Sequence, residues 1–158
     1  MKKYVIILIV ISVILIVALA IGLYFLLQKN DENKDRSFVV TVVGGPSAED
    51  HPGYEVGGGN KYAINGSVAE SDVTLTLYQG GTYKFDQSDS TNETHPLRFS
   101  ITSNGIHGGG TEYSDGVITS GVPGNQGAYT QITVAVGAPT LYYYCTAHNG
   151  MGWKANTP

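Results

Sequence analysis

The sequence contains little cysteine and little charge, and both shortages narrow the classes of protein that it can encode. Cys145 is the only cysteine among 158 residues. A single thiol excludes an internal disulfide and any centre that needs two cysteines, such as a four-thiolate iron–sulfur cluster. Charged residues make up 14% of the chain, and residues 37–158 hold four Lys/Arg against ten Asp/Glu. An acidic region with so few cations is a poor candidate for binding nucleic acid, and we expect no nucleic-acid partner.

The N-terminal part of the chain contains a long uncharged stretch. Tyr4 to Leu27 has no charge and no proline, and as a helix these residues would be about 36 Å long against a hydrocarbon core of roughly 30 Å. Ala18-Leu-Ala20 resembles a signal-peptide cleavage site, but the apolar run continues beyond it to Leu27. The sequence therefore predicts an uncleaved transmembrane anchor over residues 1–27, followed by a polar linker over residues 28–37.

Residues 38–158 have the composition and the patterning of an all-β domain. Glycine occurs 21 times and tyrosine 11 times in the chain, and short alternating runs are separated by turn signals, with no helical period. These features predict one antiparallel β-sandwich without internal repeats. The predicted strands are Phe38–Val43, Lys61–Ile64, Asp72–Tyr78, Thr82–Phe85, His95–Ile101, Val117–Thr119, Tyr129–Val136 and Thr140–Tyr144.

The alternation within two of these strands directs polar side chains into the core. His95 begins a run whose in-phase members are apolar, and Cys145 ends another such run. Two potential ligands from separate strands are therefore expected to face the interior. The in-phase residues expected to be buried are Val73, Leu75 and Leu77; Leu97, Phe99 and Ile101; Ile132, Val134 and Val136; and Leu141 and Tyr143.

Four residues form a candidate metal-ligand set. Cys145, His148 and Met151 lie within seven residues, and His95 supplies a second imidazole. A thiolate and two imidazoles with a weak thioether are the ligands of a mononuclear blue-copper site. Zinc also accepts a Cys, His, His set. Taken singly, each side chain is more often a packing residue; the shared phase and spacing favour a metal site.

At these residues the chain resembles the cupredoxin family. The resemblance rests on His95, on Cys145-x-x-His148-x-x-Met151, and on the strand–turn–strand segment Leu75–Phe85. It is closest to cupredoxin-like domains of marine viral and bacterial proteins. It implies a Greek-key β-sandwich over residues 38–158 that holds one copper ion, with the two histidines and the cysteine as equatorial ligands and the methionine as axial ligand. It also implies a single-pass protein whose domain lies on the extracytoplasmic side of a membrane, or in a viral envelope.

These features predict a membrane-anchored copper protein that transfers single electrons to or from a redox protein partner. No nucleophile–base pair stands out, so an enzyme is not expected. Two alternatives stay open. One is a structural or adhesion β-sandwich on a membrane or virion surface, with metal absent or only stabilising. The other is copper storage or delivery, which the sequence does not separate from electron transfer.

Two further histidines and a tyrosine-rich strand have simpler interpretations. His51 and His107 lie in glycine-rich segments, and we expect both to be solvent-exposed loop residues. Tyr142 and Tyr144 are expected to be packing aromatics and not redox relays.

Overall fold

The computed structural model describes residues 2–32, 35–56 and 59–158, which belong to two compact units, Met1–Asn33 and Lys34–Pro158. The first unit contains helix α1, Lys2–Glu32. Within the described residues, no helical stretch combines the length and the apolarity needed to cross a membrane. The structure thus does not support the predicted transmembrane helix. The predicted polar linker also differs, because α1 continues through Glu32 and strand β1 begins at Asp35.

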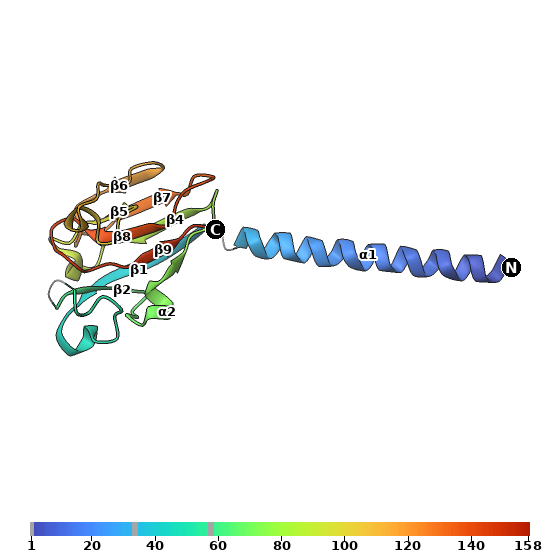
Figure 1. The fold of residues 1–158 in the computed structure, drawn as a ribbon, viewed down its shortest axis with the longest axis horizontal. Coiled ribbons are helices and arrows are strands. Elements are labelled where there is room, and N and C mark those ends of the chain that lie inside the picture. The colour runs from blue at the N-terminus through green and yellow to red at the C-terminus, as the bar shows by residue number, and fades with distance from the viewer. Residues whose placement is uncertain (1, 33–34, 57–58) are drawn as a thin grey trace. The chain divides into compact units, whose positions relative to one another are not determined.

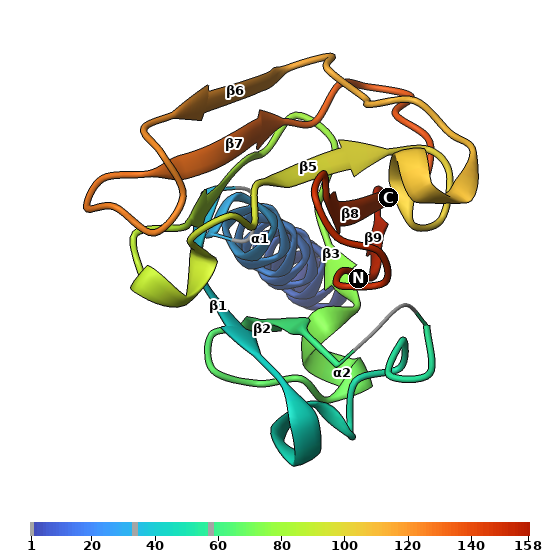
Figure 2. The same ribbon diagram turned by 90° about the vertical axis from the view of Figure 1, so that its left-hand side faces the viewer.

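The second unit is built from two β-sheets, as the sequence predicted (Figures 1 and 2). The five-stranded sheet has the order β2-β1-β4-β7-β6, and the four-stranded sheet has the order β3-β9-β8-β5. The first comprises β1 Asp35–Val43, β2 Lys61–Ile64, β4 Thr82–Asp86, β6 Val117–Ser120 and β7 Tyr129–Thr133. The second comprises β3 Leu75–Thr76, β5 Leu97–Ser100, β8 Leu141–Cys145 and β9 Lys154–Asn156. The short helices are η1 Gly45–Ala48, α2 Glu70–Val73, η2 Ser90–Asn92 and η3 Gly105–Gly108.

The core lies between these sheets and receives apolar side chains from both. Phe85 of β4 and Phe99 of β5 are fully buried, and their ring centroids lie 5.4 Å apart in an edge-to-face arrangement. Phe38 stacks on Phe85 from the neighbouring strand. The Phe85–Phe99 pair stabilises the packing of the two sheets on each other, because large apolar surfaces leave water together. The same core cluster contains Cys145 and Met151.

Several details of the predicted strands were wrong. The segment predicted as one strand from Asp72 to Tyr78 contains the turn of helix α2 and only a two-residue strand β3. Its alternation is nevertheless confirmed, since Val73, Leu75 and Leu77 are buried. The prediction of a purely antiparallel sandwich was also wrong, because β1 pairs with β4 and β3 pairs with β9 in parallel.

The ends of two strands differ from their predicted phase, and one strand was missed. Ile101 and Val136 were expected in the core but are 57% and 88% exposed. Both lie beyond the last paired residue of their strands, Ser100 and Thr133, so the alternation no longer sets their direction. Strand β9 was not predicted because three residues are too short to show a period.

Candidate metal centre

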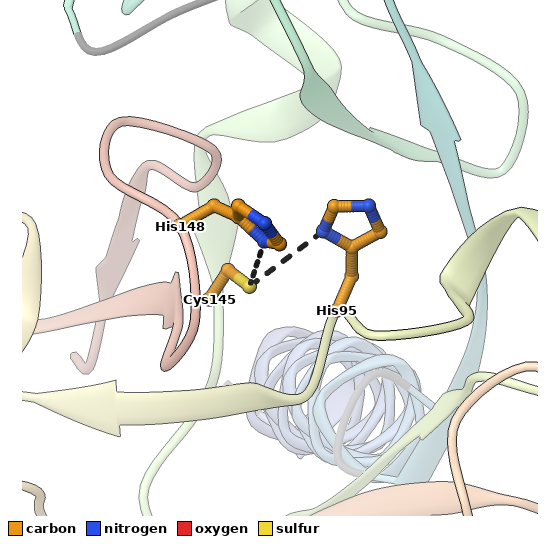
Figure 3. Close-up of side chains that lie close together, drawn as sticks. All are labelled: His95, Cys145 and His148. Atoms are coloured by element: carbon orange, nitrogen blue, oxygen red, sulfur yellow. Dashed lines mark hydrogen bonds between the residues drawn. The ribbon is translucent and has the colours of Figure 1, made fainter.

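The pairing of β5 with β8 brings two of the predicted ligands together. Leu97 and Cys145 are register partners in this antiparallel pair, and His95 lies two residues before Leu97. The Thr146 N–H donates to the Pro96 carbonyl at 3.1 Å, which joins the two segments beyond the last strand pair. His148 returns from the loop that follows Cys145, so that its ring lies beside that of His95 (Figure 3), with the ring centroids 4.5 Å apart.

The separations of the three donor atoms suit a single metal ion. The Cys145 Sγ lies 3.8 Å from His95 Nδ1 and 3.7 Å from His148 Nδ1, and the three donor atoms all lie within 4.8 Å of one another. A metal with bonds of about 2.3 Å to sulfur and about 2.0 Å to nitrogen would separate a sulfur and a nitrogen atom by about 3.7 Å at a trigonal angle. His95, Cys145 and His148 therefore form a cluster that could hold a metal ion.

Burial and electrostatics favour the metal-binding form of His95. Its side chain is 8% exposed, and Cys145 is fully buried, whereas His148 is exposed. Burial lowers the pKa of His95, and the nearby imidazole of His148 lowers it further. A lowered pKa keeps the imidazole neutral, and the neutral ring has the lone pair that a metal binds. The site thus has a buried side, formed by the thiol and His95, and a solvent-facing side, formed by His148.

A buried polar network fixes the backbone of His95. The Tyr62 hydroxyl and the Gln87 side-chain amide each donate to the His95 carbonyl at 2.8 Å. The Gln87 Oε1 also accepts from the Leu97 N–H at 3.1 Å, so one side chain holds both flanks of Pro96. Burial in the core raises the pKa of Tyr62, and the nearby Cys145 thiol adds to this shift, so the hydroxyl keeps the proton that it donates. Residues of this kind orient ligands without touching the metal.

Met151 is buried and lies close to the candidate site in the sequence, but its burial does not test its predicted role as axial ligand. Its side chain is 1% exposed and belongs to the core cluster that includes Cys145. Its carbonyl accepts the Tyr62 N–H at 2.8 Å, which attaches the end of the Cys145–Met151 loop, called the ligand loop below, to strand β2. Coordination by Met151 stays a prediction.

One of the two loop histidines, His51, does not lie where the sequence predicted. His51 was expected in solvent but is 2% exposed, and its ring meets Trp153 edge-on with centroids 6.1 Å apart. Its Nδ1 accepts from the Gly53 N–H at 3.0 Å. His107 is exposed, as expected, yet its Nε2 lies 3.0 Å from the Cys145 carbonyl and donates to it. The contacts of His51 with Trp153 and of His107 with the Cys145 carbonyl could not be read from the local pattern, because the fold places these two partners.

Tyr144 is a packing residue, in agreement with the prediction. It is 1% exposed and lies beneath η3, with its ring edge-on to that of His107.

Asn104 was not singled out in the sequence, although the Asn104-Gly105 pair is a turn signal. Its side chain contacts the loop that carries His148.

Comparison with known proteins gives no match for this chain among family models, curated proteins or solved structures. The geometry of His95, Cys145 and His148 is therefore the main indication of function in this chain.

Proposed function

We propose that the domain binds one copper ion through His95, Cys145 and His148, with Met151 as a weak axial ligand, and serves in single-electron transfer. The observation that carries this proposal is the convergence of one thiol and two imidazole Nδ1 atoms, with sulfur–nitrogen separations of 3.7 and 3.8 Å. The proposal includes the Greek-key cupredoxin arrangement that the sequence resemblance implies.

The residue types support copper over harder metals. Thiolate stabilises Cu(I) and imidazole supports Cu(II), so this set suits an ion that changes oxidation state. When bound, copper supplies a one-electron couple. The protein's own contribution is a fixed set of donors: Cys145 ends a paired strand, and His95 is held by two buried hydrogen bonds. A donor set that changes little between oxidation states lowers the reorganisation that accompanies electron transfer.

The asymmetry of the site indicates where an electron would enter or leave. Cys145 is buried, whereas His148 is exposed. A redox protein partner would therefore approach the His148 side, where the path from the site to the surface is shortest.

Attachment to a membrane is a separate part of the proposal and rests on the sequence alone. Tyr4 to Leu27 is uncharged, and a segment of this length suits a single-pass anchor with the domain on the extracytoplasmic side or in a viral envelope. Alkaline carbonate extraction tests it. An anchored chain stays in the membrane pellet, and its release into the supernatant would contradict the proposal.

The metal site is tested by titrating the domain with Cu(II). Residues 34–158 are the suitable span, because β1 begins at Asp35. We expect one copper per chain, an intense visible thiolate-to-copper band, a matching electron paramagnetic resonance spectrum and reversible reduction. Cys145→Ser should abolish the band, because its hydroxyl does not replace the thiolate. A colourless titration, or a band unchanged in Cys145→Ser, would contradict the proposal and favour a structural or adhesion module.

A further inference from the structure

The loop that carries His148 contacts a second loop, residues 102–110, which contains η3. The Asn104 side chain makes two of these contacts: its Oδ1 accepts the Gly150 N–H at 2.8 Å, and its Nδ2 donates to Asn149 Oδ1. His107 Nε2 makes the third, to the carbonyl of Cys145 at 3.0 Å. Asn104 and His107 thus hold both ends of the ligand loop, on either side of His148.

The backbone conformation of residues 102–110 lets this second loop pack closely on strand β8 and on the ligand loop. Asn104 and Gly105 both have left-handed backbone angles, with φ of 62° and 55°. A Cβ at Gly105 would lie 2.5 Å from the Tyr144 ring, so only glycine lets η3 pack this closely on β8. Asparagine is one of the few side-chain-bearing residues that tolerate such angles. The conformation therefore directs Asn104 toward the ligand loop at little conformational cost.

These contacts use only protein atoms, so none of them needs a metal ion as a partner. The Gly150 N–H lies in the irregular loop that follows β8, and the Cys145 carbonyl lies at the end of β8, where regular backbone pairing stops. Each contact joins segments far apart in the chain, with separations of 46 and 38 residues. Asn104 and His107, which are not proposed ligands, thus also fix the position of the ligand loop.

We propose that Asn104 and His107 are positioning residues, which hold the Cys145–Met151 loop in its metal-binding conformation before metal arrives. This inference rests on the proposed function for its effect on copper, but its structural part holds independently. Partner groups of this kind typically affect metal affinity by about 10–100-fold. Loss of either side chain should therefore weaken binding without removing a ligand.

The test compares Asn104→Gly with Asn65→Gly in the full chain, kept in solution with a mild detergent. Glycine removes the side chain without imposing left-handed strain. Asn65 is a matched control: its φ is 51°, and its Oδ1 accepts the Val39 N–H at 2.9 Å. Both variants lose a side-chain acceptor of a backbone N–H, but only Asn104 contacts the ligand loop. His107→Ala and His107→Gln form a second pair, because a glutamine amide can still donate to the Cys145 carbonyl.

The first readout needs no metal. Amide hydrogen exchange of metal-free protein should show at least about tenfold faster exchange of Gly150 in Asn104→Gly, with little change in the core strands. Asn65→Gly should leave Gly150 unchanged. Equal Gly150 exchange in wild type and Asn104→Gly would overturn the proposal, whatever the outcome for copper.

The second readout is copper affinity, measured by competition with a chelator. We expect a loss of about 10–100-fold in Asn104→Gly and His107→Ala, partial recovery in His107→Gln, and retention of the thiolate-to-copper band throughout. If Asn65→Gly weakened copper binding as much as Asn104→Gly, a general stability effect would explain the loss and the positioning role would be refuted. If wild-type protein bound no copper, the proposed function would fail while the exchange experiment still decided the positioning role.

Discussion

Replacement of Gln87 by leucine tests the buried network behind His95 most directly. Gln87 is 1% exposed, accepts from the Leu97 N–H at 3.1 Å and donates to the His95 carbonyl at 2.8 Å. Leucine is similar in size but offers neither group. The Leu97 N–H would lose its partner while buried, which costs about 1–3 kcal/mol. The His95 carbonyl would keep the Tyr62 hydroxyl, so this second loss costs about 0.5–1.5 kcal/mol.

The free energy of unfolding should therefore fall by about 1.5–4.5 kcal/mol in Gln87→Leu, against about 0.5–1.5 kcal/mol in Tyr62→Phe. The assay is urea denaturation of metal-free residues 34–158. With a slope of about 2 kcal/mol per molar urea, the midpoint should fall by about 1–2 M in Gln87→Leu and by about 0.5 M in Tyr62→Phe. Gln87→Leu should be the less stable of the two variants, because it leaves the buried Leu97 N–H without a partner, whereas Tyr62→Phe leaves the His95 carbonyl with one of its two donors.

Gln79→Leu is the matched control for this comparison. Gln79 also makes two side-chain bonds to the backbone, donating to the Thr157 carbonyl at 2.9 Å and accepting from the Gly137 N–H at 2.7 Å, but it is only partly buried. Water can replace both partners there, so we expect a loss below about 1 kcal/mol. Equal losses in Gln87→Leu and Gln79→Leu, or a larger loss in Tyr62→Phe than in Gln87→Leu, would refute the reasoning.

Three further substitutions test separate features by the same urea assay. Burial, and then the charge of Lys61, lowers the pKa of His51 to about 4 in the folded protein, against about 6.5 in the unfolded chain. The free energy of unfolding should therefore decline by up to about 3 kcal/mol as the pH falls from about 6.5 toward 4. The His51→Gln variant should lack this decline. Equal acid sensitivity of wild type and His51→Gln would contradict this origin. Gly105→Ala should cost about 2–5 kcal/mol, since its Cβ would meet the Tyr144 ring at 2.5 Å and its φ is 55°; a loss below about 1 kcal/mol would show that η3 can move away. Thr94→Asn should raise stability by about 0.5–1.5 kcal/mol, because Thr94 has a φ of 66° that a β-branched residue rarely adopts, and an unchanged midpoint would mean that this strain is absent.

The sequence by itself determined the two-sheet β architecture and the cluster of His95, Cys145 and His148. Alternation along the strands placed His95 and Cys145 toward the interior, and both are buried. The spacing Cys145-x-x-His148 brought the second imidazole back to the thiol within one short loop. These predictions succeeded because they depend on local geometry: a strand has a period of two, and three residues of loop have a short reach.

The tertiary structure alone decided the surroundings of the site. The contacts of Asn104 with Gly150 and of His107 with Cys145 cross 46 and 38 residues of sequence. The burial of His51 against Trp153, the parallel pairing of β1 with β4 and the exposure of Val136 also depend on which segments meet. A local pattern records the direction of a side chain but not the distant segment that it will meet, because that neighbour is selected by the packing of the whole core.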